Sequence, residues 1–267
     1  MRLRAPLVLA TAGLLSLTAC GGSSSSDAAA GSTAGTEDAG LSGTLTVFAA
    51  ASLTDVFTDL GDQLMADNPD LTVEFNFAGS SALATQIGQG APADVFASAN
   101  QTQMTVVTDA GLAGGDPTVF TENVLEIAVP QGNPADVTGI DDFGDPDLTL
   151  AVCAPDVPCG AAAEQVFEAA GVTAQPDTLE EDVRAALTKV ELGEVDAALV
   201  YASDVQSAGD SVEGITFPEA EDAVNEYPIA TLAAAPNPEA AQAFLDLVES
   251  DAGQQALTDA GFRSPGA

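Results

Sequence analysis

Short apolar segments alternate with helix-like segments along most of this chain, and that alternation limits the folds open to it. The first part contains predicted strands at residues 45–49, 71–77 and 94–97, which alternate with predicted helices at 53–65, 81–88 and 100–110. Strands and helices in this order form α/β folds, in which the strands are mostly parallel. We therefore expect an α/β fold built on a mostly parallel sheet.

The same alternation begins again near residue 124. Predicted strands follow at residues 124–129, 148–152, 197–201 and 228–233, and predicted helices at 161–170, 183–192, 238–248 and 253–260. No low-complexity linker separates the halves, so we expect two lobes joined by crossovers near residues 121–125 and 225–229. Lobe 1 would hold residues 41–122 and 228–267, and lobe 2 residues 123–227. Ligands of open α/β sheets sit beyond the carboxyl ends of the strands, which predicts a ligand cleft between the lobes.

The N-terminal residues resemble an export signal. Arg2 and Arg4 precede an apolar run that ends in Leu-Thr-Ala-Cys20, the pattern of a secretory signal whose cysteine becomes lipidated. The run is too short for a permanent membrane span. Residues 1–19 are therefore predicted to be a signal peptide, and residues 20–40 a lipidated Cys20 with a flexible Gly/Ser/Ala-rich tether. The alternative is an ordinary signal peptide in which Cys20 is incidental.

The charge balance excludes some partners. The chain of 267 residues carries 41 acidic and 5 basic side chains, a net charge of −36, and it has no His. Such a field repels nucleic acid and anionic lipid surfaces, so contact with a membrane is expected through the lipid anchor alone. The lack of His removes the commonest general base and metal ligand.

Two further cysteines lie six residues apart, Cys153 and Cys159. In an oxidising compartment, with Cys20 lipidated, they are the one pair available for an intramolecular disulfide. A metal site is the alternative, but two thiolates without His make a poor one. We predict a Cys153–Cys159 disulfide.

Four places put a small donor at the end of a strand and the start of a helix. They are Ser52, Ser80, the Pro158-Cys159-Gly160 segment ahead of a helix at 161, and Val183 after Asp182. Helix N-termini present free N–H groups and a positive dipole end, which favours anions. Each could equally be an ordinary helix cap. Their recurrence favours an anion site between the lobes.

The residues around these positions resemble a known family. The motifs are Val-Phe-Ala-Ala-Ala-Ser52-Leu-Thr, Phe-Ala-Gly-Ser80-Ser81-Ala-Leu-Ala, Gly-Ala-Pro-Ala-Asp94-Val-Phe-Ala-Ser, Glu-Asp-Val183-Arg-Ala-Ala-Leu, Val-Tyr201-Ala-Ser-Asp204 and Tyr227-Pro-Ile-Ala. Together they resemble the periplasmic molybdate-binding proteins of ABC transporters, here in a lipoprotein form. The resemblance runs from about residue 45 to 262.

This resemblance implies a two-lobed periplasmic-binding-protein fold of type II and a site without metal or cofactor. The implied ligands of the oxyanion are the Ser52, Ser80 and Tyr201 hydroxyls and the backbone amides of Cys159 and Val183. The implied ligand is molybdate, together with tungstate, and the implied partner is the membrane permease of an ABC importer. The protein would be a monomer at the extracytoplasmic face of the cell membrane. Asp94 and Asp204 would be structural. The sequence departs from the family pattern at Gly79, where Ser is common, and at Cys159, where a small residue such as Ala is usual.

Two other functions remain open at this point. Another tetrahedral oxyanion such as sulfate would suit the same donors, because pocket size cannot be predicted from these motifs. A secreted hydrolase with Ser52 or Ser80 as nucleophile needs a base, and the one lysine, Lys189, lies in a predicted helix away from both serines. We therefore expect a binding protein and no enzyme.

Overall fold

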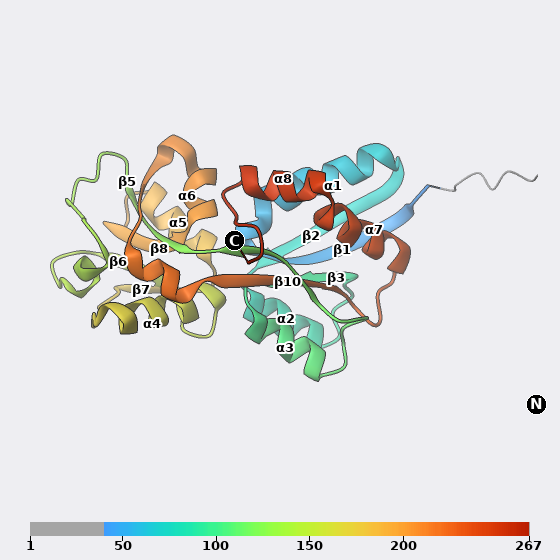
Figure 1. The fold of residues 1–267 in the computed structure, drawn as a ribbon, viewed down its shortest axis with the longest axis horizontal. Helices are drawn as coiled ribbons and strands as arrows, with labels where there is room; N and C mark the ends of the chain where they lie inside the picture. The colour runs from blue at the N-terminus through green and yellow to red at the C-terminus, as the bar shows by residue number, and fades with distance from the viewer. Residues whose placement is uncertain (1–39, 267) are drawn as a thin grey trace, which may run out of the picture. The chain divides into compact units, whose positions relative to one another are not determined.

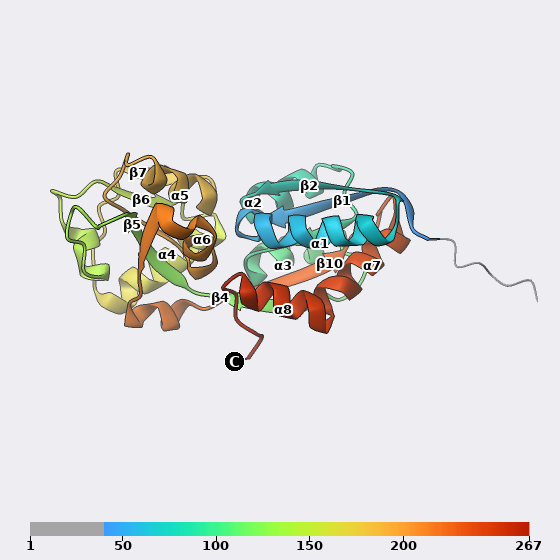
Figure 2. The same cartoon turned by 90° about the horizontal axis from the view of Figure 1, so that it is seen from above.

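The computed structural model describes residues 40–266, which form one compact unit built around two five-stranded sheets. The predicted signal peptide, Cys20 and most of the tether lie outside the described residues. Figure 1 shows the two sheets side by side, and Figure 2 shows the same arrangement from above. We call each sheet with its covering helices a lobe.

The lobe 1 sheet has the strand order β2-β1-β3-β10-β4. Its strands are β1 (Ser42–Ala50), β2 (Asp70–Ala78), β3 (Val95–Ala97), β4 (Thr118–Asn123) and β10 (Asn225–Thr231). β1 pairs in parallel with β2 and β3, whereas β10 runs antiparallel to β3 and β4. The sheet is therefore mostly parallel, as predicted, with one reversed strand that arrives from lobe 2.

Helices cover both faces of this sheet. They are α1 (Thr54–Asp67), α7 (Pro238–Glu249) and α8 (Asp251–Asp259) on one face, and α2 (Ser80–Gly88) and α3 (Gln101–Asp109) on the other. In α7 the residues Ala240, Ala241, Phe244 and Val248 are buried, a helical period that places one apolar stripe on the sheet. Phe244 packs edge-on against Phe57 of α1. This packing holds α1, which directly follows the turn that contains Ser52, against α7.

The lobe 2 sheet repeats the pattern with the strand order β7-β6-β8-β5-β9. Its strands are β5 (Leu125–Pro130), β6 (Leu150–Cys153), β7 (Thr178–Glu180), β8 (Ala197–Tyr201) and β9 (Val212–Ile215). β8 is buried along its whole length, which accounts for its unbroken apolar sequence. The helices are α4 (Pro158–Ala170), α5 (Val183–Glu191) and α6 (Ala202–Ala208). The reversed strand here is β5, which comes from lobe 1.

The chain passes between the lobes twice, at adjacent positions. It leaves lobe 1 between Asn123 and Leu125 and returns at Asn225, which pairs with Asn123 in the β4–β10 ladder.

Four short 3₁₀ segments complete the trace between residues 40 and 266. They are η1 (Ala51–Leu53), η2 (Ile140–Gly144), η3 (Gly209–Ser211) and η4 (Pro218–Ala223).

The structure corrects one predicted boundary that bears on the site. The sequence placed Pro158, Cys159 and Gly160 ahead of a helix at residue 161, but α4 begins at Pro158. Proline suits the first helical position, where its missing N–H costs nothing, so the helix can begin at Pro158. Cys159 is thus the second residue of the helix.

No helix between residues 40 and 266 is both long and apolar enough to cross a membrane.

Candidate functional site

The five residues implied by the sequence motifs meet at one small cavity between the lobes. The space open to the centre of a water molecule there is about 10 Å³. Its lining comes from lobe 1 (Ala50, Ala51, Ser52, Ala78, Gly79, Ser80 and Ala99) and from lobe 2 (Val157, Pro158, Cys159, Asp182, Val183 and Tyr201). The lining holds no Lys or Arg and one carboxylate, that of Asp182, so an anion here would have neutral donors as its favourable contacts.

Ser52 reaches the cavity from the carboxyl end of β1. The strand runs into η1, a single 3₁₀ turn that contains Ser52, and α1 follows directly. The Ser52 hydroxyl is buried and lies 3.0 Å from the hydroxyl of Tyr227 on β10. If Tyr227 donates in this pair, the Ser52 proton is free to point into the cavity.

Ser80 occupies the matching position at the end of β2. It is the first residue of α2 and is almost completely buried. Its hydroxyl oxygen accepts the Ala99 N–H at 3.0 Å. A hydroxyl has one proton to donate besides its acceptor sites, and in this contact Ser80 uses an acceptor site. Its O–H proton therefore remains available for a ligand.

Tyr201 ends β8 and brings a third hydroxyl from lobe 2. Its oxygen accepts a hydrogen bond of 3.1 Å from the Asn225 amide, whose Nδ2 also donates to the Ala99 carbonyl at 2.7 Å. Burial raises the pKa of Tyr201 well above its ordinary value, so the phenol stays protonated at neutral pH. The protonated hydroxyl keeps a proton that it can donate, and Tyr201 is one of the residues that line the cavity.

Two helix N-termini also line the cavity. Cys159 and Val183 lie in the first turns of α4 and α5, where backbone N–H groups have no partner within the helix. The Asp182 carboxylate caps α5 by accepting the Ala185 N–H at 2.9 Å. Cys159 is bonded to Cys153 in a disulfide that joins the end of β6 to the start of α4. The predicted pairing of these cysteines is present in the structure.

Asp94 and Asp204 are the two buried carboxylates, and both have structural partners. Asp94 accepts the Thr46 and Asn237 N–H groups, which ties β1 to the start of α7. Asp204 accepts the Tyr201 N–H at 3.0 Å. Burial raises the pKa of Asp204 to about 7, while the Arg184 charge and the Tyr201 N–H act in the lowering direction. The Arg184 Nε lies 3.2 Å from Asp204 Oδ1, although the two lack the alignment of a hydrogen bond.

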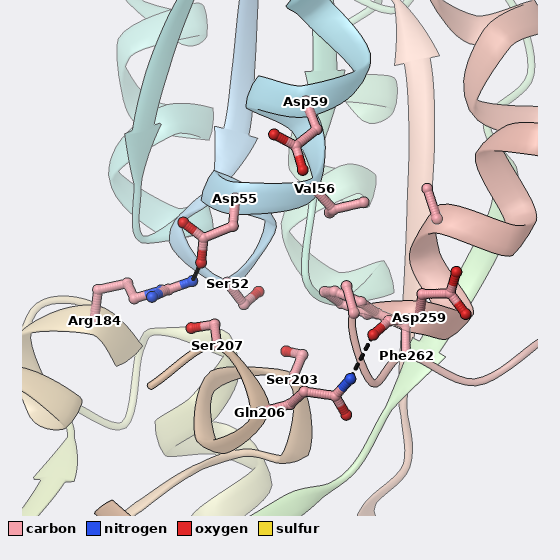
Figure 3. A pocket seen from close by; sticks show the side chains of 12 residues that line it. Ser52, Asp55, Val56, Asp59, Arg184, Ser203, Gln206, Ser207, Asp259 and Phe262 are labelled. Carbon is pink, nitrogen blue, oxygen red and sulfur yellow. Dashed lines mark hydrogen bonds and ion pairs between the residues drawn. The ribbon is translucent and has the colours of Figure 1, made fainter. Parts of the chain in front are cut away.

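A wider groove of about 510 Å³ opens beside Ser52 and is shown in Figure 3. Arg184 of lobe 2 pairs there with Asp55 of lobe 1, and Gln206 donates to the Asp259 carbonyl across the same gap. Contacts of this kind hold the lobes together in the observed conformation. The groove is larger than the cavity, but its carboxylates make it a poor place for an anion.

The arrangement in the small cavity favours one kind of ligand. Three residues whose hydroxyl oxygens have protein partners and the first turns of two helices line one cavity from two lobes. Such a set offers donors and needs an acceptor-rich ligand, which is the chemistry of an oxyanion. Ser52 has a tyrosine hydroxyl as its partner and Ser80 a backbone amide, so neither has a neighbouring base of the kind that activates a nucleophile.

Sequence reasoning missed the residues that orient these donors. Each of the three hydroxyls has its own partner: Ser52 contacts Tyr227, Ser80 contacts the Ala99 amide, and Tyr201 contacts Asn225. Beside them, the Asn123 amide donates to Ser203 at 2.8 Å. Tyr227 lies in one of the family motifs, Tyr227-Pro-Ile-Ala, but the motif by itself indicates no contact with Ser52. A signal was present in the polar residues of Asn225-Glu-Tyr227, since polar side chains within a buried strand need partners.

Comparison with known proteins shows the family to which this chain belongs. The family of bacterial extracellular solute-binding proteins matches residues 45–263, and the chain belongs to that family. It is 43% identical to the molybdate-binding protein ModA of Mycobacterium tuberculosis over 249 residues, which cover 93% of each chain. The resemblance drawn from the motifs is confirmed at the level of the family.

Two solved structures agree with the fold. The periplasmic molybdate-binding protein of Azotobacter vinelandii superposes with a TM-score of 0.73 at 18% identity, covering 83% of this chain and 99% of that one. The sulfate-binding protein SubI of Mycobacterium tuberculosis gives a TM-score of 0.71 at 18% identity, covering 84% and 87%. The predicted two-lobed binding-protein fold is therefore confirmed.

Proposed function

We propose that this protein is the extracytoplasmic solute-binding subunit of an ABC importer and that it captures molybdate in the cavity between its lobes. The observation that carries the proposal is the convergence of the Ser52, Ser80 and Tyr201 hydroxyls with the amides of Cys159 and Val183. The 43% identity to a protein named for molybdate binding supports the choice of ligand.

Neutral donors suffice to hold a dianion in this acidic protein. Hydrogen bonds to a charged acceptor contribute about 1.5–3 kcal/mol each. Repulsion from the surface carboxylates weakens over about 8 Å at physiological salt. Five donors at contact distance therefore outweigh a diffuse negative field.

The donor set also selects among oxyanions. Phosphate keeps a proton at neutral pH and needs an acceptor, whereas the five proposed contacts are all donors. Asp182 is the one carboxylate that lines the cavity, and one of its oxygens accepts the Ala185 N–H. Molybdate is fully deprotonated and only accepts. Tungstate has the same charge and shape, and we include it in the proposal.

Sulfate is the second candidate, because a sulfate-binding protein shares the fold. It is also a fully deprotonated tetrahedral dianion, but it is smaller than molybdate, so donors spaced for molybdate would contact it less well. Calorimetric titration with molybdate, tungstate, sulfate and phosphate separates these possibilities. Tighter binding of sulfate than of molybdate would leave the oxyanion site in place but refute the named substrate.

We further propose that the protein is anchored to the outer face of the cell membrane through Cys20, as a monomer that delivers its ligand to a permease. The Leu-Thr-Ala-Cys sequence and the Gly/Ser-rich segment after it support this anchor. Membrane fractionation of a Cys20→Ala variant is the test. The variant should leave the membrane fraction, and a variant that stays there would refute the anchor.

In this proposal the lobe 1 sheet with its helices moves as one body and the lobe 2 sheet with its helices as the other. The boundaries between the bodies then lie at the crossovers, near residues 123–125 and 225, a few residues from the predicted boundaries at 122/123 and 227/228. Closure around the oxyanion would stabilise the state in which donors from both bodies contact it. Solution scattering should show a smaller radius of gyration on binding.

A further inference from the structure

Arg184 joins the two lobes in the groove beside Ser52. It belongs to α5 in lobe 2, and its guanidinium group forms an ion pair with Asp55 of α1 in lobe 1, as Figure 3 shows. On the other side of the guanidinium group, the Arg184 Nε atom lies 3.2 Å from Oδ1 of Asp204. The arginine therefore stands between a carboxylate of its own lobe and a carboxylate of the other lobe.

The two carboxylates are held to different degrees. The Asp204 side chain is completely buried and also accepts the Tyr201 N–H, so this end of the arrangement is fixed within lobe 2. The Asp55 side chain is exposed, and Arg184 is its ion-pair partner among residues 40–266. A side chain that is already oriented loses less conformational entropy when a second partner arrives. The pair of Arg184 with Asp55 is thus the contact that would form and break as the lobes close and separate.

The three members of this arrangement each follow a proposed ligand closely in the chain. The pairs of ligand and neighbour are Ser52 with Asp55, Val183 with Arg184, and Tyr201 with Asp204. None of the three neighbours lines the cavity itself. The ion pair therefore joins the segments that carry donors of both lobes, and its loss would let those donors move apart.

An effect of this ion pair on anion binding has the opposite sign to that of an ordinary surface charge. Asp55 places a negative charge close to Ser52, so repulsion alone would make its neutralisation strengthen the binding of an anion. As a partner of Arg184, its neutralisation would instead remove a contact of the closed state and weaken binding. The direction of the change separates the two roles.

We propose that Arg184 and Asp55 are positioning residues, whose ion pair stabilises the closed state of the lobes around the bound oxyanion without touching the ion. This inference rests on the proposed oxyanion function and deepens it. Asp204 orients the arginine from within lobe 2, and Asp55 completes the pair from lobe 1. The ion pair thus raises the population of the state in which donors from both lobes contact the ligand.

The test compares Asp55→Asn with the parent and with Asp59→Asn. Asp59 lies one turn further along α1 and lines the same groove, but it forms no ion pair with the residues that the structure describes. Both changes keep the size of the side chain and remove one negative charge. Both residues are exposed, so neither change should unfold the protein, and denaturant unfolding checks this.

Two readouts follow each variant. Calorimetric titration with molybdate at low and at physiological salt gives the dissociation constant. Spin labels on cysteines introduced at Asp109 and Glu168, exposed on α3 and α4, report the separation of the lobes in the full chain carrying Cys20→Ser. The label distances are measured with and without molybdate.

We expect Asp55→Asn to bind molybdate about two- to fivefold more weakly and to lose short-distance population, since exposed ion pairs contribute modestly. The difference from the parent should shrink as salt is added. Asp59→Asn should bind at least as tightly as the parent. Asp55→Glu, which keeps the charge, should restore binding to within about twofold of the parent.

A second cycle tests the coupling between the two residues. In an Arg184→Gln background Asp55 has no arginine to pair with, so Asp55→Asn should there behave like Asp59→Asn and no longer weaken binding. The single change at the exposed Asp55 decides the question even where loss of the arginine disturbs the fold around the buried Asp204.

Molybdate binding by Asp55→Asn that equals or exceeds that of the parent would overturn the inference, and so would an equal loss in Asp59→Asn. A parent that binds no oxyanion would refute the proposed function instead. In that case the label distances of the ligand-free proteins still decide about the ion pair. A smaller short-distance population in Asp55→Asn than in the parent would support it, and equal populations would overturn it.

Discussion

The Ser52 hydroxyl lies 3.0 Å from the hydroxyl of Tyr227, a residue 175 positions further along the chain. Tyr227 belongs to β10, the strand that returns from lobe 2, and it is completely buried. Burial raises the pKa of Tyr227, so this phenol also keeps its proton at neutral pH. It can therefore donate to Ser52 and turn the serine proton toward the cavity.

Replacing either serine by alanine should weaken molybdate binding without unfolding the protein. Each change removes one hydrogen bond to a charged acceptor, which corresponds to about 1–3 kcal/mol, or roughly 5- to 150-fold in the dissociation constant. Titration calorimetry of Ser52→Ala and Ser80→Ala measures this loss. Ser81→Ala, which does not line the cavity, is the matched control. Parent-like binding by both site variants would refute the assigned donors.

Tyr201→Phe should lower molybdate affinity by a similar factor and should also weaken closure. The hydroxyl belongs to lobe 2, so its loss removes a contact made only when the lobes come together. The readouts are the dissociation constant and the ligand-induced change in radius of gyration. If affinity fell while compaction remained complete, Tyr201 would be a ligand without a part in closure.

Asp182→Asn should strengthen molybdate binding by roughly threefold at low salt, and the gain should shrink as salt is added. Asparagine caps a helix about as well as aspartate, so α5 should keep its cap on Ala185 while the cavity loses a negative charge. Asp141→Asn on η2, which changes the net charge equally but does not line the cavity, controls for the overall field. Weaker binding by Asp182→Asn would mean that the carboxylate contributes to the site.

Asp204 should make the free energy of unfolding fall as pH rises from about 4 to about 7. Its pKa is about 7 in the folded protein and near 3.8 when unfolded, so across this interval the native state binds more protons than the unfolded state. The full pKa shift corresponds to a change of at most about 4 kcal/mol in the free energy of unfolding. Arg184, Asp55 and Asp182 are the charged groups that act on it.

Many other carboxylates titrate below pH 7, so the informative quantity is the difference between the parent and Asp204→Asn. Asparagine can still accept the Tyr201 N–H through its amide oxygen. Denaturant unfolding of both proteins at pH 4.5, 6 and 7.5 should show the stability of the parent falling relative to that of the variant. A constant difference would refute the raised pKa.

Loss of the disulfide should cost stability more than binding. Cys153 and Cys159 are six residues apart and close a short loop. The loss of chain entropy in the unfolded state predicts that this bond stabilises the folded protein by about 2 kcal/mol. The Cys159 amide, and not its side chain, is the proposed ligand. A Cys153→Ser, Cys159→Ala double variant should therefore unfold at lower denaturant while its molybdate affinity changes by no more than about fivefold. A loss of affinity as large as that of Ser52→Ala would show that the bond positions the amide.

The sequence predicted the main strands and helices because their patterns are local. β8 is a continuous apolar run, and α5 begins after an aspartate cap, so both were predicted with nearly correct bounds. Four elements lack such a local pattern and were not predicted, namely the strands β4, β7 and β9 and the helix α6. β7 and β9 are short, and β4 lies at the crossover, where Thr118–Asn123 forms a strand because β10 supplies its partner.

The candidate site was predictable as a set of motifs but not as a network. Ser52, Ser80 and Val183 each stand at a strand-to-helix junction, which a linear sequence displays. The partners of the hydroxyls come from far along the chain: Asn225 lies 126 residues from Ala99, yet its amide joins Ala99 to Tyr201. Such pairings depend on where β10 lies, and no local pattern specifies that.

The adjacent passages of the chain between the lobes have a kinetic consequence. Asn123 and Asn225, which pair across these two strands, hydrogen bond to Ser203 and Tyr201, while Tyr227 on the same returning strand holds Ser52. Separation of the lobes must bend the segments that aim the ligand hydroxyls. If the proposed function holds, we expect ligand escape and the flexing of these strands to share one barrier, so that Asn123, Asn225 and Tyr227 would set the residence time of a bound oxyanion without touching it.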